Sequence, residues 1–300
     1  MMASKKSFKT ELEENGYCII EDVLNEEEIL DTIQLHKQWR EQLRRISKTN
    51  GGVNDLDNFH ANMDPHGIYK YFEAGHQEHA WFIRTNPKVI DIYKELWETD
   101  DLVVSFDGSC YIPKEWTKKD TIWTHTDKGP ENEDMCVQGF VALTSNKERT
   151  LMVYEGSHKL HKEYFRNYSY KNKGNWQLIN HDYLELIKDR QRILDVKAGS
   201  LVLWDSRTFH QNRFGKPNSE ERFVQYVCYL PRHHKLNNNS QQKKRKEYLE
   251  TRRTTSHYPY PIKVNAKQGR TFGNEDLFID YDLLPEPNND RFSKVIQELI

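Results

Sequence analysis

The sequence predicts an α+β protein that is mainly β, an antiparallel β-sandwich or jelly roll with helices packed outside it. Three observations support this prediction. Helical patterns dominate the first third of the chain, short runs of β-branched and aromatic residues follow them, and turn residues separate these runs. Several short strands after a helical start are typical of two packed β-layers.

The N-terminal helices are expected from their start signals. Asn25 followed three residues later by Glu28 forms a capping box, and apolar residues at helical spacing continue to about residue 46. The dipeptide Asn86-Pro87 predicts a second helix with proline at its first position. The stretch 48–67 between them is rich in Gly, Asn and Asp and predicts a loop.

The remaining elements are expected from local composition and periodicity. We expect residues 1–235 to form one domain, and residues 236–300 to be an extension packed on that same domain. Helices are expected at 158–168, 181–190 and 241–253, and strands at Leu102–Phe106, Cys136–Leu143, Leu151–Tyr154, Arg192–Val196, Leu201–Trp204 and Phe223–Leu230.

Bulk composition predicts a soluble, cytoplasmic protein. Only 36% of the residues are hydrophobic and 30% are charged. No run approaches the roughly 18 apolar residues of a membrane-spanning helix, and the N-terminus has no apolar signal region. The four cysteines are far apart in the sequence, which argues against a thiolate zinc site and fits reduced thiols.

The net charge of -2 gives no strong attraction to nucleic acid or to an anionic membrane. A basic run lies within 243–253, and a run of this size on a nearly neutral protein is typical of a solvated helix face. We therefore expect a small-molecule substrate, with no membrane and no nucleic-acid partner.

The segment His125-Thr126-Asp127 offers two ligands for a catalytic metal ion. Residues at i and i+2 of a strand point to the same face, and Thr121–Thr124 predicts a strand that ends there. The pattern is weak alone, since about one chance match is expected in so histidine-rich a chain. Two related His-x-Glu pairs, at 76–78 and 161–163, are expected to have surface or capping roles.

A second histidine and an arginine make the metal prediction specific. The segment Lys197–Asp205 predicts a turn and then a strand, which delivers His210 just past its end. Arg222 opens the next strand, and an antiparallel return would bring it back near His210. Two histidines and one carboxylate leave one face of iron(II) open for a 2-oxo acid and dioxygen. The guanidinium can hold the distal carboxylate of 2-oxoglutarate.

These motifs resemble the phytanoyl-CoA dioxygenase family of Fe(II)/2-oxoglutarate oxygenases over roughly residues 15–232. The matching segments are Trp123–Asp127, Leu151–His158, Ala198–His210 and Arg222, with a similar opening at 16–24. The resemblance implies a cupin-like double-stranded β-helix with flanking N-terminal helices. It also implies a residue assignment: Fe(II) on His125, Asp127 and His210, and 2-oxoglutarate near Arg222, Gln138, Phe140 and Asn212.

The implied reaction consumes 2-oxoglutarate and O2, releases succinate and CO2, and hydroxylates the substrate. Asp127 favours hydroxylation over halogenation, because halogenases of this class usually need a small residue there. Arg149-Thr150 replaces the family's usual paired glycines, and the match is closer to relatives other than the enzyme acting on phytanoyl-CoA. We therefore do not expect a CoA ester as substrate. The alternative is a non-catalytic metal-binding β-sandwich that acts as a binding module.

Substrate contacts are expected from polar or aromatic residues that flank the metal motif. The candidates are Trp81, Arg84, Asp107, Tyr111 and Arg207. For Arg207, an ion pair with Asp205 is the competing role.

Overall fold

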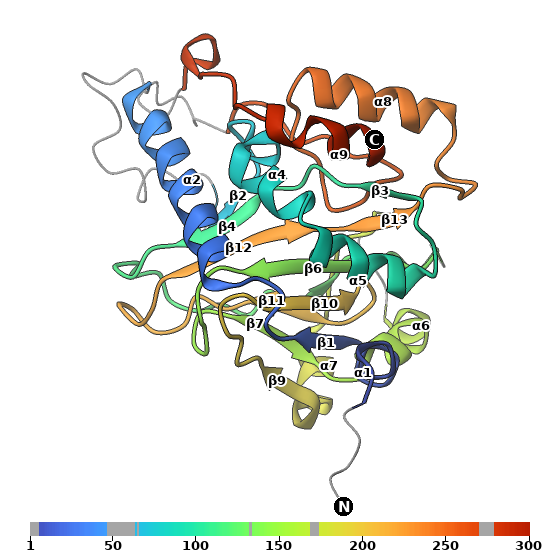
Figure 1. Ribbon diagram of the computed structural model, residues 1–300. Coiled ribbons are helices and arrows are strands. Elements are labelled where there is room, and N and C mark those ends of the chain that lie inside the picture. The colour runs from blue at the N-terminus through green and yellow to red at the C-terminus, as the bar shows by residue number, and fades with distance from the viewer. Residues whose placement is uncertain (1–5, 47–63, 65, 132–133, 169–173, 270–278) are drawn as a thin grey trace, which may run out of the picture.

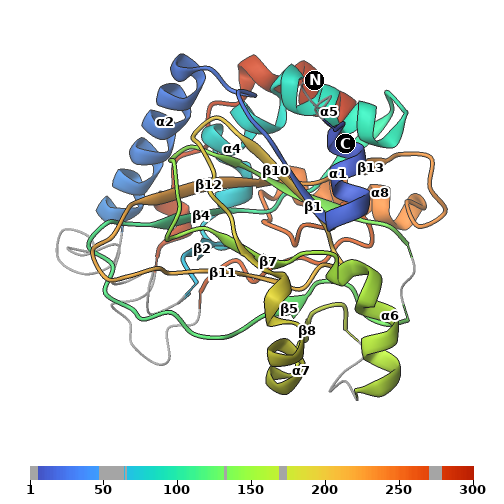
Figure 2. The ribbon, with the colours of Figure 1, turned by 90° about the horizontal axis from the view of Figure 1, so that it is seen from below.

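The computed structural model describes residues 6–46, 64, 66–131, 134–168, 174–269 and 279–300. Two antiparallel sheets lie face to face, and helices cover the outer side of the larger sheet (Figure 1 and Figure 2). The larger sheet has the order β1 (Tyr17–Ile20), β10 (Leu201–Asp205), β6 (Val137–Ala142), β12 (Arg222–Val227), β4 (Ser109–Ile112) and β2 (Ile68–Tyr69).

The smaller sheet carries the metal motif in its middle. A separate two-stranded sheet is formed by β3 (Leu102–Val104) and β13 (Tyr229–Pro231). All the strand pairs of these sheets are antiparallel. The smaller sheet has the order β8 (Gln177–Leu178), β5 (His125–Thr126), β11 (His210–Asn212), β7 (Leu151–Tyr154) and β9 (Gln191–Ile193).

Helices surround this β-structure. In the described segments, none of them is both long and apolar enough to cross a bilayer. The α-helices are α1 (Phe8–Asn15), α2 (Glu26–Arg45), α4 (Glu78–Arg84), α5 (Pro87–Trp97), α6 (Ser157–Asn167), α7 (His181–Leu186), α8 (Asn239–Glu250) and α9 (Ser293–Glu298), and the 3-10 helices are η1 (Ala74–His76), η2 (Lys188–Arg190), η4 (Tyr281–Leu283) and η5 (Asp290–Phe292).

Strand alternation divides the core into two layers. One set of side chains from the larger sheet fills the space between the sheets, and the other set packs against α4 and α5. The inner layer includes Phe140, Val202 and Val224 of the larger sheet with Leu151 and Val153 of the smaller sheet. The outer layer includes Val141, Leu203 and Phe223 with Trp81, Val89 and Tyr93 of the helices.

The predicted helix starts are confirmed. The Asn25 side chain accepts a hydrogen bond from the backbone N–H of Glu28, and the Glu28 side chain accepts one from the N–H of Asn25. Pro87 opens α5, whose N-cap Asn86 accepts from the N–H of Lys88. The residues of each helix-start signal lie within a few positions of one another, and so both signals can be recognised from the sequence alone.

Two strand predictions are wrong in detail. The expected strand at Thr121–Thr124 is irregular, and β5 begins only at His125. The side chain of Gln211 replaces a neighbouring strand there: its Oε1 accepts from the N–H of Trp123, and its Nε2 donates to the carbonyl of Thr121. The expected strand Phe223–Leu230 is split at Cys228, because β12 and β13 belong to different sheets. Most of the loop predicted at 48–67 lies outside the described residues.

Arg149, at the position of an expected glycine, is fully buried and holds two loops together. Its guanidinium donates to the carbonyls of Phe214, Trp116 and Pro113. Burial lowers the pKa of Arg149, with Glu220 opposing that effect. The departure from the family pattern therefore has a structural role.

Replacing Arg149 by methionine should destabilise the fold, because the carbonyls that it satisfies become unpaired. We expect a loss of at least about 2 kcal/mol in the free energy of unfolding, measured by urea denaturation. The matched control is Arg166→Met on the exposed side of α6, which should change it by less than about 0.5 kcal/mol. Equal effects of the two substitutions would contradict the structural role of Arg149.

Candidate active site

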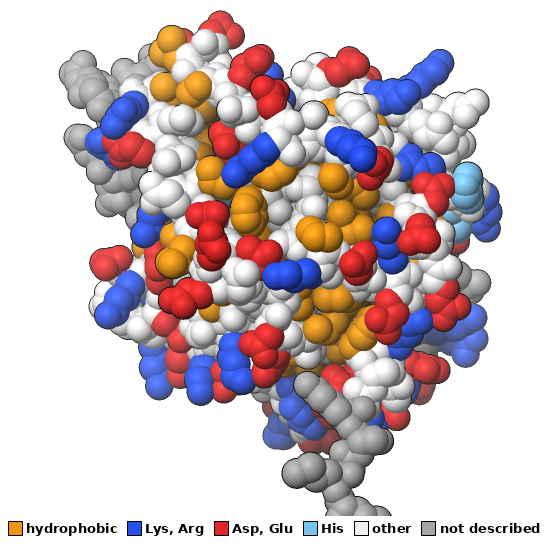
Figure 3. Space-filling view, in the orientation of Figure 1, with side chains coloured by type: hydrophobic (Ala, Val, Ile, Leu, Met, Phe, Trp, Pro, Cys, Tyr) orange, Lys and Arg blue, Asp and Glu red, His pale blue; other side chains and the backbone are white. Residues whose placement is uncertain are grey.

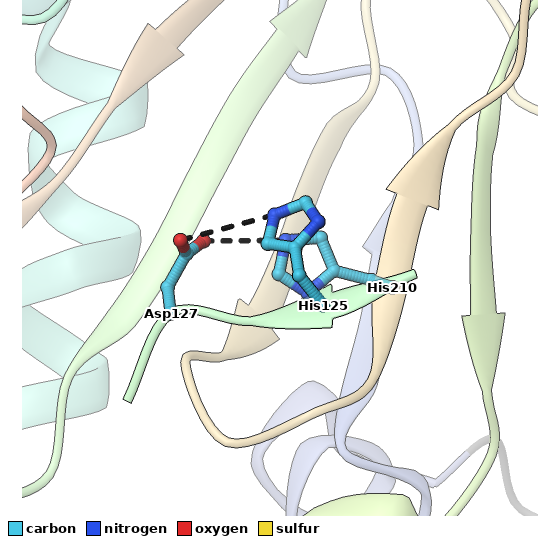
Figure 4. Close-up of side chains that lie close together, drawn as sticks. All are labelled: His125, Asp127 and His210. Carbon is cyan, nitrogen blue, oxygen red and sulfur yellow. Dashed lines mark ion pairs between the residues drawn. The ribbon is translucent and has the colours of Figure 1, made fainter. Parts of the chain in front are cut away.

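Three side chains converge where β5 and β11 meet (Figure 4). His125 on β5 and His210 on β11 are directly paired across the two strands, and their ring centroids are 4.5 Å apart. Asp127 follows two residues after His125, so its side chain lies on the same side. Its oxygens lie 3.3 Å from Nε2 of His210 and 3.8 Å from Nε2 of His125.

Backbone carbonyls orient both imidazole rings. Nδ1 of His125 lies 3.1 Å from the carbonyl oxygen of Trp123, and Nδ1 of His210 lies 2.8 Å from that of Thr208. A proton on Nδ1 leaves the lone pair of Nε2 facing Asp127, which is the usual arrangement of metal-binding histidine. Burial, together with His210, lowers the pKa of His125 to about 3, so this ring is a neutral ligand.

Asp127 is held by its backbone and by one side chain. Its N–H donates to the carbonyl of Ser206, and Nε2 of Gln138 donates to Oδ2 at 2.9 Å. Burial alone would raise the pKa of Asp127, but the nearby histidines, His257 foremost, outweigh burial and hold it well below its usual range. A charged carboxylate beside two imidazoles suits a divalent cation.

This cluster is the one group of His, Cys, Asp or Glu in the described segments that could hold a metal ion. The His-x-Glu pair at 76–78 has another role, since His76 is buried and its Nε2 contacts the carbonyl of Arg253. At 161–163, His161 is buried on α6 and its Nε2 contacts the carbonyl of Lys128. His76 and His161 are therefore both buried, whereas the sequence predicted surface or capping roles for them.

A cavity of about 440 Å³ opens onto the three ligands. Its size is in the range of about 300–1,000 Å³ that is usual for small-molecule sites. The wall combines aromatic rings with a few polar groups. The aromatic lining residues are Trp123, Trp176, Trp204, Tyr226 and Tyr258, and the polar ones include His66, Lys70, Asp107, Gln138, Asn212, His257 and Lys263.

Arg222 lies in the larger sheet, whereas the expected antiparallel return would have placed it near His210 in the smaller sheet. β12 pairs with β6 and β4 in the larger sheet, so Arg222 is not on a strand neighbouring His210. Its side chain points between the sheets, and its guanidinium carbon lies 5.5 Å from the ring centre of Phe140. Arg222 is 1% exposed, and neither Nη1 nor Nη2 has a hydrogen-bond partner among the described residues.

Gln138 and Asn212 border the cavity, whereas Arg222 and the ring of Phe140 that its guanidinium covers are not among the described residues of the wall. Nδ2 of Asn212 donates to the hydroxyl of Tyr226 at 2.8 Å. Tyr226 follows Arg222 by four residues on β12, so strand alternation places both side chains on the inner face. This alternation could have identified Tyr226 from the sequence.

Of the five expected substrate contacts, only Asp107 borders the cavity. Arg84 lies behind it and contacts Asp107, and Trp81 is buried in the outer core layer. Tyr111 donates to Glu221 instead. Arg207 forms a two-point ion pair with Asp205, which was its competing role.

Sequence reasoning missed the contribution of the C-terminal extension. Thr255–Tyr258 and Lys263 line the cavity, and the hydroxyl of Tyr258 donates to the backbone carbonyl of Asp127. Tyr258 also packs in a buried cluster with Val103 and Leu230. No local motif marks these residues, because only long-range packing brings them to the metal cluster.

Solved structures share this fold. GIG2 (DUF1479) from Candida albicans matches with a TM-score of 0.63 at 17% identity, covering 97% of this chain and 75% of that chain. EctD from S. alaskensis, solved with 2-oxoglutarate and 5-hydroxyectoine, matches with a TM-score of 0.50 at 16% identity, covering 74% of each chain. The likeness to these structures establishes the fold, and the His/Asp/His cluster is a ligand set that could hold a metal ion.

The chain belongs to the phytanoyl-CoA dioxygenase (PhyH) family, whose sequence profile matches residues 12–213. This match confirms the expected family, which is a family of dioxygenases. "Ava biosynthesis cluster protein O" from Aspergillus versicolor is 33% identical in an alignment of 178 positions that covers 54% of this chain. The chain spans about 57% of the length of that curated relative.

Removing one ligand should abolish tight metal binding. We expect His210→Ala to weaken binding of Ni²⁺, a redox-inert substitute for iron, by at least about a hundredfold in calorimetric titration. The matched control is His233→Ala, since the His233 side chain is 87% exposed and should not affect the affinity. Unchanged Ni²⁺ binding by the His210 variant would show that the ion is held elsewhere.

Proposed function

We propose that the protein hydroxylates a small organic substrate, with Fe(II) on His125, Asp127 and His210 and the distal carboxylate of 2-oxoglutarate on Arg222. The observation that carries the proposal is the buried guanidinium of Arg222, whose Nη1 and Nη2 have no hydrogen-bond partner among the described residues. A buried charge without a partner costs several kcal/mol, and so a protein retains one where a ligand of opposite charge binds. A carboxylate matches the planar fork of arginine.

Neighbouring residues support a dicarboxylate between the metal ligands and Arg222. Gln138 and Asn212 are proposed to contact the cosubstrate because both border the cavity, and Phe140 to support the guanidinium from below. We add Tyr226, whose hydroxyl is already fixed by Asn212. Burial raises the pKa of Tyr226 far above its ordinary value, so its hydroxyl remains a hydrogen-bond donor.

Bound Fe(II) and 2-oxoglutarate together supply the activation of dioxygen and the oxidation of a C–H bond. The chain's own task is placement. Gln138 fixes one oxygen of Asp127, the Nδ1 contacts fix the two imidazoles, and the aromatic wall excludes water from the reacting centre. The carboxylate at Asp127 also occupies the position that a halide would need, which favours hydroxylation.

The name of the Aspergillus versicolor relative assigns that protein to a biosynthesis cluster, and this supports a small-molecule substrate here. All four cysteines are unpaired and buried, which agrees with the proposed cytoplasmic location. Lys, Arg, Asp and Glu are interspersed on the face seen in Figure 3. This mixture supports the expectation of no nucleic-acid partner. We treat residues 236–300 as an extension of one catalytic domain.

Arg222→Met tests the cosubstrate site. The substitution should weaken 2-oxoglutarate binding by about tenfold to a hundredfold, because it removes a two-point charged contact. It should not lower the free energy of unfolding, because a buried unpaired charge is replaced by an apolar chain. The control is Arg213→Met, which breaks only a partly exposed pair with Asp120. A large loss of stability in Arg222→Met with unchanged 2-oxoglutarate affinity would contradict the proposal.

The activity itself is tested by succinate release. The iron-loaded protein under oxygen should convert 2-oxoglutarate to succinate slowly, and a metabolite that fits the cavity should accelerate this release. His125→Ala should abolish the signal. If no condition yielded succinate, the alternative of a non-catalytic metal-binding module would be favoured.

A further inference from the structure

Asp107 and His257 border the cavity and are neither metal ligands nor proposed cosubstrate contacts. Asp107 follows β3 in the chain, whereas His257 comes from the C-terminal extension, and both border the cavity. Thr255 joins the two segments: its N–H donates to the carbonyl of Phe106, and its hydroxyl accepts from the N–H of Phe106.

The carboxylate of Asp107 is fixed at one oxygen only. Oδ1 accepts from the hydroxyl of Ser105 at 2.7 Å and lies 3.4 Å from Nη2 of Arg84. Oδ2 accepts no hydrogen bond from any described residue. Asp107 borders the cavity, and so Oδ2 is available to a ligand there.

The backbone around Asp107 is rigid, which makes it a preformed site. Arg84 has a fully buried side chain and donates to the carbonyls of Asp107 and Gly75. Gly108 packs so closely that a Cβ atom there would lie 1.6 Å from the carbonyl oxygen of Tyr69. The backbone at Asp107 is therefore fixed, and its carboxylate could turn away from the cavity only by breaking the contacts of Oδ1 with Ser105 and Arg84.

His257 presents a second unused polar atom on the same cavity wall, where the carboxylates that act on it are first Asp127 and then Asp107. Its Nε2 is buried and has no hydrogen-bond partner among the described residues. A buried polar atom of this kind costs free energy unless a ligand or water pairs with it. The carboxylate offers acceptors only, and the ring of His257 can supply either a donor or an acceptor.

The cavity also offers an aromatic platform close to the metal ligands. The ring of Trp176 lies 5.5 Å from the ring of His125 and is tilted by 35°. Trp176 is 47% exposed, so part of its indole is accessible to a ligand in the cavity. Two lysines also line the cavity. Lys70 is paired with Asp64 at 2.6 Å, and Lys263 lies on an exposed segment.

We propose that Asp107 and His257 bind a hydrogen-bond-donating nitrogen of the substrate, an amine or amidine, while Trp176 covers its apolar part. This inference rests on the proposed function, because it names the substrate class of that same site. Asp107 is a specificity residue here: it selects the substrate and takes no part in metal or 2-oxoglutarate binding.

The test uses three probes that share one ring: phenethylamine, 2-phenylethanol and 3-phenylpropanoate. Each is titrated by calorimetry into full-length protein loaded with Ni²⁺ and 2-oxoglutarate. The amine should bind at least about tenfold more tightly than the carboxylate, the alcohol should lie between them, and Asp107→Asn should remove most of that preference. Asp100→Asn, at a side chain that is 93% exposed, should keep it.

A second variant separates charge recognition from stacking. Trp176→Ala should weaken all three probes by a similar factor and leave the amine-to-carboxylate ratio unchanged. Equal or tighter binding of 3-phenylpropanoate, no measurable amine binding at millimolar concentration, or an unchanged ratio in Asp107→Asn would each overturn the proposal. Asp107→Asn should bind 2-oxoglutarate normally. Failure of the proposed function would instead appear as unchanged 2-oxoglutarate affinity in Arg222→Met.

Discussion

The metal site depends on the antiparallel pairing of β5 with β11. This pairing sets His125 directly opposite His210, so both rings leave the sheet on the same side. β5 has only two residues and would be weak by itself. Gln211 on β11 reinforces it by three side-chain hydrogen bonds to Thr121, Trp123 and Thr124. The side chain of Gln211 on β11 therefore fixes the segment that leads into β5.

Three buried arginines show how this fold separates structure from ligand binding. Arg149 and Arg84 both donate to backbone carbonyls and hold loops in place. Arg222 is equally buried, but its Nη atoms have no acceptor among the described residues. Burial takes all three guanidinium groups out of water, and the difference lies in what compensates for this. For Arg222 we propose that the compensating partner is the cosubstrate.

The C-terminal extension shapes the substrate side of the cavity. The N–H of Thr255 donates to the carbonyl of Phe106, and the hydroxyl of Thr255 accepts from the N–H of Phe106. These bonds fix the segment that carries His257 next to the segment that carries Asp107. Tyr258 reaches the carbonyl of Asp127, which ties the extension to the metal ligands themselves. The family profile ends at residue 213, so this wall is a feature that the family match does not describe. Substrate choice is thus proposed to depend on residues outside the family core.

The sequence by itself determined the features that depend on local contacts. The capping box at Asn25, the proline start at Pro87 and the strand Leu151–Tyr154 were all readable, because their signals lie within a few residues. The metal cluster was readable as well, because its motif has family-specific flanks. Only the tertiary structure decided which sheet carries Arg222, that Gln211 replaces a strand at 121–124, and that His257 reaches the cavity. Those outcomes depend on partners far away in the chain, and the residues concerned carry no periodicity that reveals such partners.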